Sequence, residues 1–283
     1  MNSTRKTQQL ITPQAVVEGA GVKLKRSIGT RTLDYLDPFL LLDHFDSKNP
    51  ADYEAGFPLH PHRGIETVTY VLSGAVNHKD TLGSKGTIGT GDVQWMTAGR
   101  GIMHAEMPQV RPEGIAGFQL WVNLPAKLKM TKPRYQEISA SEIPEIDRQG
   151  AKIRLISGQL DGISGPIRGI AADPIYMDVK LPPHNVFVQR INPDHTAFAY
   201  LFEGEAAVST EDGNEETLVQ HPRLLVLGAG NEVQIASREN AARFLLVSAK
   251  PLGEPIARYG PFVMNTQEEI EQALADLRQG TFV

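Results

Sequence analysis

The sequence predicts an all-β protein, and three observations support this: short strand-like segments, an internal duplication and one well-marked helix. Among 283 residues, 26 glycines and 19 prolines divide the chain into short apolar pieces. Many short strands bounded by turn residues are typical of β-sandwiches and barrels rather than of alternating strands and helices. The expected strands, rich in β-branched and aromatic residues, are residues 67–76, 117–124, 152–158, 174–181, 196–208, 223–230 and 242–249.

The two halves of the chain resemble each other. The segment "ETVTYVLSGAV" (66–76) resembles "TAFAYLFEGEAAV" (196–208) when Gly74 is aligned with Gly204, and "VQWMTAG" (93–99) resembles "LLVLGAG" (224–230). The offsets of these two pairs are 130 and 131 residues, as expected for a tandem duplication of one all-β unit. We place the boundary in the polar segment 139–150, which predicts domains at residues 1–139 and 140–283.

One helix is expected near the C-terminal end. Thr266 and Glu269 have the spacing of a capping box. Apolar residues then recur at helical spacing, and Gly280 follows as a stop signal. We expect this helix to pack on a β core through Ile270, Ala273, Leu274 and Leu277.

Composition excludes several classes of function. The 28 basic and 33 acidic residues give a net charge of −5, so we expect no direct nucleic-acid binding, which requires clustered Lys and Arg. The absence of cysteine excludes disulfides, thiolate metal sites and cysteine nucleophiles. The first residues lack the apolar stretch of a signal peptide, and no run reaches membrane-spanning length. We therefore expect a cytoplasmic protein without membrane contact.

Two pairs of polar residues share an unusual spacing. His60 and His62 in "FPLHPHRGIET" (57–67) are two residues apart, and so are His104 and Glu106 in "MHAEM". Residues two apart in a strand point to the same face. On facing strands, the two pairs would bring three imidazoles and one carboxylate together inside a barrel, which predicts a divalent transition-metal site with open coordination positions.

A polar loop or a set of hydrogen-bonded core histidines is the alternative explanation for either pair taken alone. The other histidines lack this arrangement, and we expect them to be surface or structural residues: His44, His78, His184, His195 and His221.

The same region resembles the cupin superfamily, whose first motif is G-x5-H-x-H-x3–4-E-x6-G; the chain offers His60, His62, Glu66 and Gly74. The second cupin motif is met loosely, since Thr97 replaces its proline and four residues rather than two precede the histidine. These departures are similar to the pattern of one branch, the pirins. The segments that resemble pirins span nearly the whole chain: "LDPFLLLDHF" (36–45), "FPLHPHRGIETVTYVLSG" (57–74), "GDVQWMTAGRGIMHAEMP" (91–108), "QLWVNLP" (119–125) and "GPFVMNTQEEI" (260–270).

This resemblance implies a bicupin, with two tandem jelly-roll β-barrels and a short C-terminal helix. It implies one metal per chain in the N-terminal half, with His60, His62, His104 and Glu106 as its ligands. Glu66, a ligand in generic cupins, becomes a candidate to support the ligands if strand alternation turns it toward the pocket; a structural carboxylate is the alternative. The offsets map the four ligands to Arg190, Asn192, Ile235 and Ser237, so we expect no equivalent site in the C-terminal half.

The resemblance further implies activity of the quercetin 2,3-dioxygenase type, with O2 and a flavonol-like aromatic as substrates. Glu106 would then be the catalytic base, and Fe(II) the first choice of metal, with Mn, Ni, Cu and Zn as alternatives. Phe57, Met103 and Met107 would line an apolar mouth or simply pack in the barrel. The alternative function is a redox-responsive regulator that binds a transcription factor or a metabolic enzyme, and a metal-bound scaffold without turnover is a third. We expect a monomer.

Overall fold

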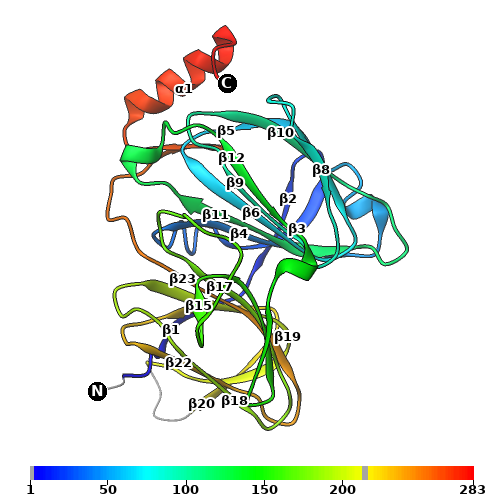
Figure 1. The fold of residues 1–283 in the computed structure, drawn as a ribbon, viewed down its shortest axis with the longest axis vertical. Coiled ribbons are helices and arrows are strands. Elements are labelled where there is room, and N and C mark those ends of the chain that lie inside the picture. The colour runs from blue at the N-terminus through cyan, green and yellow to red at the C-terminus, as the bar shows by residue number, and fades with distance from the viewer. Residues whose placement is uncertain (1–2, 212–215) are drawn as a thin grey trace. The chain divides into compact units, whose positions relative to one another are not determined.

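The computed structural model describes residues 3–211 and 216–283, which form two compact units made almost entirely of β-strands (Figure 1). The first barrel comprises Gln14–Ala140 and Leu252–Val283. The second barrel comprises the chain up to Pro13 and Ser141–Pro251. The predicted all-β fold, with two tandem jelly-roll β-barrels and a short C-terminal helix, is confirmed.

The first barrel pairs a seven-stranded sheet, in the order β12-β9-β6-β11-β4-β3-β2, with a four-stranded sheet, in the order β5-β10-β7-β8. Its strands are β2 (Gln14–Glu18), β3 (Val22–Ile28), β4 (Phe39–Ser47), β5 (Phe57–His62), β6 (Ile65–Ser73), β7 (Val76–Asp80), β8 (Lys85–Ile88), β9 (Val93–Thr97), β10 (Ile102–Pro108), β11 (Ile115–Asn123), β12 (Arg134–Ile138), β24 (Ala257–Tyr259) and β25 (Phe262–Met264). It also holds helix α1 (Gln267–Gln279) and the 3-10 turns Pro50–Asp52 and Ala126–Leu128.

The second barrel is built around β19, which pairs with four neighbouring strands. Its strands are β1 (Thr7–Ile11), β13 (Glu145–Arg148), β14 (Ala151–Ser157), β15 (Gln159–Leu160), β16 (Ile163–Ser164), β17 (Ile175–Leu181), β18 (Val186–Arg190), β19 (Thr196–Ser209), β20 (Glu216–Gln220), β21 (Arg223–Leu227), β22 (Glu232–Ala236) and β23 (Ala242–Ala249). A further 3-10 turn, Ala140–Glu142, lies where the chain passes from one unit to the next.

Local sequence signals account for most element boundaries. The helix is confirmed with both of its caps: Thr266 and Glu269 form the reciprocal capping box, and Gly280 ends the helix at a φ of 72°. The strand expected at 67–76 divides instead into β6 and β7, because Gly74 between them adopts a φ of 84°. A side chain there would also meet the backbone oxygen of Gly114, so the turn requires glycine.

The compact units are not two contiguous halves of the chain. The expected division at residues 1–139 and 140–283 stays a prediction about the duplicated segments. In space, β1 adds to the edge of β21 in the second barrel, and the segment after Leu252 returns to the first barrel. The N-terminal and C-terminal segments each join the barrel formed by the other half of the chain, because their backbone groups and apolar side chains find partners in that barrel. The predicted helix therefore packs on the first barrel rather than on the second.

The returning C-terminal segment holds the connection between β5 and β6. Gly64 in this connection has a φ of 80° and lies so close to the Val263 carbonyl that no Cβ would fit. The buried Lys129 ammonium donates to the carbonyl oxygens of Gly64 and Val263 at 2.9 and 2.8 Å and to Asn123 Oδ1 at 2.7 Å. A buried cation with three acceptors fixes the end of β5, where the predicted ligands lie.

Arg63 makes a second tie to the C-terminal segment. Its Nη1 donates to Asp276 Oδ2 on α1 at 2.6 Å, and its Nη2 donates to the Phe282 carbonyl oxygen at 3.2 Å. Its guanidinium also lies 4.4 Å from the centre of the Phe282 ring. Because Arg63 directly follows His62, α1 is linked to the predicted metal site by one residue.

Candidate metal centre

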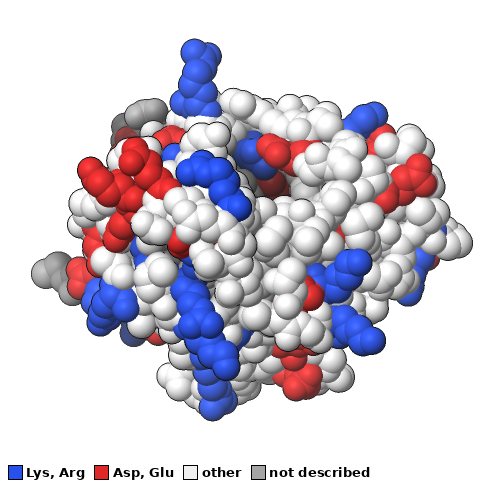
Figure 2. All heavy atoms as spheres, turned by 90° about the horizontal axis from the view of Figure 1, so that it is seen from above, with Lys and Arg blue, Asp and Glu red and all other residues white. Residues whose placement is uncertain are grey.

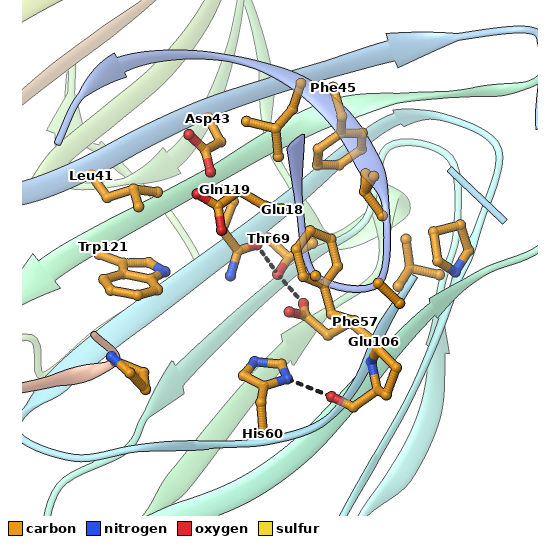
Figure 3. Close-up of a pocket in the computed structure, with 18 of the residues that line it drawn as sticks. Glu18, Leu41, Asp43, Phe45, Phe57, His60, Thr69, Glu106, Gln119 and Trp121 are labelled. Atoms are coloured by element: carbon orange, nitrogen blue, oxygen red, sulfur yellow. Dashed lines mark hydrogen bonds between the residues drawn. The ribbon is translucent and has the colours of Figure 1, made fainter. Parts of the chain in front are cut away.

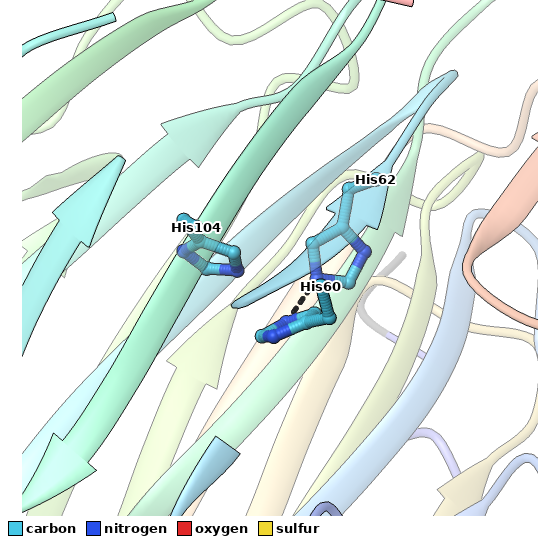
Figure 4. Close-up of side chains that lie close together, drawn as sticks. All are labelled: His60, His62 and His104. Atoms are coloured by element: carbon cyan, nitrogen blue, oxygen red, sulfur yellow. Dashed lines mark hydrogen bonds between the residues drawn. The ribbon is translucent and has the colours of Figure 1, made fainter. Parts of the chain in front are cut away.

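The predicted histidines come together on two adjacent strands. His60 on β5 lies directly opposite His104 on β10, and His62 projects on the same side of β5 (Figure 4). The ring centres of the three imidazoles are 4.5 to 5.1 Å apart, and one nitrogen of each lies within 4.8 Å of the others. Pro61 interrupts the hydrogen-bonding pattern without penalty because β5 is an edge strand of its sheet.

The protein environment keeps two of these histidines, His62 and His104, neutral. Burial lowers the pKa of His62 well below its ordinary value, and its charged forms are further disfavoured by His104 and His60. Burial lowers the pKa of His104 to about 4, although Glu106 acts in the opposite direction. Neutral imidazole is the form that binds metal ions.

Hydrogen bonding leaves nitrogen lone pairs directed into the cluster. His60 Nδ1 lies 2.9 Å from the carbonyl oxygen of Pro58 and donates to it, which leaves Nε2 as the ring nitrogen that can bind a metal. This Nε2 lies 3.0 Å from His62 Nε2. Both ring nitrogens of the buried His104 lack a hydrogen-bond partner. Buried nitrogens without partners are costly unless a cation binds them, so the three histidines fit a divalent transition metal.

Glu106 lies beside the histidines with one oxygen already held. Its Oε2 is 3.9 Å from His104 Nε2, while its Oε1 accepts a hydrogen bond of 2.9 Å from Thr69 Oγ1 on β6. Thr69 Oγ1 also lies 2.7 Å from the Gln119 amide on β11 (Figure 3). A hydroxyl carries one proton, so Thr69 donates to Glu106 when Gln119 turns its amide nitrogen toward Thr69. These two hydrogen bonds, from Gln119 to Thr69 and from Thr69 to Glu106, orient the Glu106 carboxylate and leave its Oε2 directed at the histidines.

Part of the cluster lies on the wall of a cavity of about 560 Å³ within the first barrel. His60, His62 and Glu106 line it, and its remaining wall is mostly apolar, with aromatic side chains on several strands (Figure 3). The space-filling view shows a hollow bordered by acidic and basic side chains on one face (Figure 2). A cavity of this size and lining is typical of small-molecule sites. The apolar and aromatic lining residues include Leu41, Phe45, Tyr53, Phe57 and Trp121.

Of the three apolar residues for which a cavity mouth and plain barrel packing were alternatives, only Phe57 lines the cavity. Met103 instead packs under α1 with Phe262 and Met264. Met107 lies against Gly56, and neither methionine borders the cavity. Both occupy odd positions on β10, where strand alternation turns them away from the side that carries His104 and Glu106.

Glu66 does not reach the cavity. Its Oε1 accepts a 2.7 Å hydrogen bond from Thr97 Oγ1, the residue directly opposite on β9, and burial raises its pKa. The expected alternation from His60 to Glu66 is interrupted by the bend at Gly64 between β5 and β6. Thr69, three residues further along β6, faces the cavity, so Glu66 points to the opposite side of the strand.

Sequence reasoning missed several polar residues around the site. Thr69 and Gln119 sit in segments that read as plain strands, and nothing in their spacing indicates a contact across two strands. His78, expected to be surface or structural, is buried on β7 opposite Glu106 and binds Glu137 Oε1 at 2.9 Å. Its position two residues before Asp80 in "VNHKD" repeats the spacing of the ligand pairs, which was the available signal.

The offsets of the duplication gave the wrong counterparts for β5. His60 pairs with His104, whereas Ile235, the expected counterpart of His104, pairs with Phe187 on β18. The counterpart of His60 is therefore Phe187 and not Arg190. The reason is a longer connection in the second barrel, where five residues separate β18 from β19 while two separate β5 from β6.

Comparison with known proteins places this architecture in a family. Residues 21–122 match the family described as Pirin, and residues 176–283 match the Pirin C-terminal cupin domain. A pirin-like protein of Caulobacter vibrioides is 44% identical over 280 residues, which cover 98% of this chain and 99% of that protein. The chain belongs to the pirin family.

Solved structures agree with this assignment. A crystal structure of quercetin 2,3-dioxygenase from Acinetobacter baumannii superposes with a TM-score of 0.87 and 35% identity, covering 99% of both chains. A bacterial pirin from Escherichia coli in complex with nickel(II) shares the fold at a TM-score of 0.55 and 19% identity, covering 86% of this chain and 98% of that one. Within the part of the pirin chain that the structure describes, no helix combines the length and apolarity needed to cross a membrane.

Proposed function

We propose that this pirin is a metal-dependent dioxygenase that opens the ring of a flavonol with O2, a reaction of the quercetin 2,3-dioxygenase type. The observation that carries the proposal is the cluster of three histidines beside Glu106, of which His60, His62 and Glu106 line a mostly apolar cavity of about 560 Å³. A cavity of this volume accommodates a planar molecule of several rings. The similarity to the Acinetobacter baumannii quercetin 2,3-dioxygenase supports the proposal.

His60, His62, His104 and Glu106 would hold one divalent metal. When bound, such a metal supplies Lewis acidity toward a substrate hydroxyl and a redox-active centre for the reaction with O2. We propose Fe(II) as this metal, with Mn, Ni, Cu and Zn as ions that the same ligands tolerate. The nickel complex of the E. coli pirin shows that the fold accepts a divalent metal in that protein.

The chain's own residues have separate tasks in this proposal. Glu106 Oε2 accepts the proton of the flavonol hydroxyl, while Thr69 holds Oε1 and keeps the carboxylate oriented. The deprotonated flavonol is electron-rich and reacts with O2 more readily than the neutral molecule. Phe57 and Trp121 contact its planar rings, and the apolar walls exclude water that would compete for the base.

Oxygen uptake tests the proposal directly. We expect protein reconstituted with Fe(II) to consume O2 in the presence of quercetin, and we expect His104→Ala protein not to do so. Glu106→Gln keeps the shape of the side chain but removes the base, so uptake should fall by about a hundredfold or more. Absence of uptake with every first-row divalent metal, in protein that has bound the metal, would contradict the proposal.

A second function, regulated binding of a partner protein, is favoured by one contact. Arg63 follows His62 in the chain and binds Asp276 on α1, so a change at the metal ligands can reach an exposed helix. We propose that oxidation of a bound metal would alter α1 and with it the affinity for a transcription factor or metabolic enzyme.

Hydrogen exchange tests this link. We expect amides of α1 to exchange faster in one oxidation state of the iron-loaded protein, and Asp276→Asn to abolish that difference. The matched control is Glu113→Gln, which removes an exposed ion pair with Arg111 and should change nothing. Equal exchange of α1 in both oxidation states would leave the regulatory function without a physical basis.

A further inference from the structure

The wall of the cavity carries one cation that no acidic side chain neutralises directly. Arg258 on β24 lines the cavity and donates from Nη1 to the Leu40 carbonyl oxygen at 3.2 Å. Among the described residues it makes no ion pair with a carboxylate, so most of its five N–H groups remain available to a ligand. Arg258 is an exposed residue, and the carboxylates of Asp34, Asp43 and Glu18 act on its charge from a distance.

The other charged residues of the cavity are already paired. Arg26 binds Asp43 through two hydrogen bonds of 2.7 Å and binds Glu18 through a third of 2.7 Å. Both oxygens of Asp43 and one of Glu18 are therefore directed at Arg26 and not at Arg258. This arrangement leaves Arg258 as the group that can receive a negative charge from a ligand.

Trp121 connects Arg258 with the metal centre. The Arg258 guanidinium lies over the Trp121 ring, 5.4 Å from its centre, and the centre of the His62 ring lies 5.1 Å from that of Trp121 with the two rings nearly perpendicular. A planar ligand that stacks along Trp121 can thus reach the histidines with one end and Arg258 with the other.

We propose that Arg258 forms an anion-binding subsite, so that among planar aromatic hydroxyl compounds the cavity prefers those with an acid group at the end opposite the hydroxyl. This inference deepens the proposed function, since it takes the hydroxyl-binding end of the ligand from it. A carboxylate at Arg258 forms two charge-assisted hydrogen bonds that a neutral substituent cannot form. The acid group therefore raises the affinity of an aromatic hydroxyl compound for this cavity.

A matched pair of probes tests the subsite by binding rather than turnover. The probes are 6-hydroxy-2-naphthoic acid and 6-hydroxy-2-naphthamide, titrated calorimetrically into protein loaded with Zn(II), which does not turn over O2. We expect the acid to bind about tenfold more tightly than the amide. Arg258→Gln should remove this preference, and Arg258→Lys should retain part of it.

Two controls make the result decisive. Arg111→Gln removes an exposed arginine of the same barrel and should keep the preference for the acid. Melting curves show whether each variant is folded; if Arg258→Gln does not fold, the comparison of Arg258→Lys with the unchanged protein decides. Equal affinity of both probes for the unchanged protein, or a preference that survives replacement of Arg258, would overturn the subsite. Failure of quercetin-dependent O2 uptake would overturn the proposed reaction alone, because the probes report on binding only.

Discussion

The two barrels share one fold, but their interiors are filled in opposite ways. The second barrel is packed with buried apolar side chains from nearly every strand, among them Phe187, Leu225, Ile235 and Phe244. In the first barrel, smaller apolar clusters surround a cavity and a group of buried polar residues. Phe187 and Ile235 occupy the places that His60 and His104 occupy in the first barrel.

This difference shows that a metal site in such a barrel replaces stabilising apolar packing with buried polar side chains. Apolar side chains at the inward positions stabilise the second barrel through burial and close packing. The first barrel gives up that packing for three imidazoles, of which His104 has no hydrogen-bond partner on either ring nitrogen. We therefore expect the first barrel to depend on its ligand and the second to be stable by itself.

The largest effects are expected where the two barrels have matched residues. His104→Ala should abolish metal binding, because it removes a ligand from the centre of the cluster, and it should change the stability of the metal-free protein little. Ile235→Ala at the matched position should leave metal content unchanged and lower the free energy of unfolding by about 2–5 kcal/mol. Elemental analysis and denaturant unfolding check the two outcomes; loss of metal from Ile235→Ala protein would contradict the contrast.

Acid should affect the first barrel before the second. The unfolded chain protonates His104 as the pH falls through about 6.5, whereas the folded, metal-free protein keeps it neutral down to about 4. Unfolding thus takes up a proton in this window, and stability should decrease by about 1–3 kcal/mol as the pH falls from 6.5 to 4. Both tryptophans, Trp95 and Trp121, belong to the first barrel, so their fluorescence follows its unfolding.

His104→Leu is the control for this pH dependence, since it replaces the histidine with an apolar side chain that does not titrate. The free energy of unfolding of that variant should decrease less between pH 6.5 and 4 than that of the unchanged protein. Hydrogen exchange of β19 and β23 reports on the second barrel over the same range. If both barrels unfold at the same pH, and the stability of His104→Leu protein depends on pH as steeply as that of the unchanged protein, the predicted difference between the barrels is wrong.

The smallest of these effects is expected for the Thr69 hydroxyl, which contacts the predicted ligand Glu106 but is not itself a ligand. Thr69→Val removes the donor to Glu106 Oε1 without changing the size of the side chain, and the carboxylate loses its orientation. Metal affinity or kcat/KM should fall by about tenfold, while Thr69→Ser, which keeps the hydroxyl, should restore most of it. Unchanged affinity and turnover in Thr69→Val protein would mean that Glu106 is positioned by other contacts.

Much of the fold could be predicted from local sequence because short-range physics fixes it. The capping box of Thr266 and Glu269 and the stop at Gly280 define α1 without reference to the rest of the chain. Strand periodicity likewise located the apolar strands and placed His60 with His62, and His104 with Glu106, in pairs on common faces. The pairing of β5 with β10 then brings three of these residues to one point.

What the sequence alone determined is therefore the all-β architecture, its two related units and the histidines that converge in one of them, since alternation and turn residues act over a few positions. Only the tertiary structure decided how these parts meet. The bend at Gly64 turned Glu66 away from the cavity, β1 and the C-terminal segment joined the barrels opposite their own halves, and Thr69, Gln119 and Arg258 entered the site from distant strands. Such contacts depend on strand register and on side chains far apart in the chain, and local patterns carry no information about either.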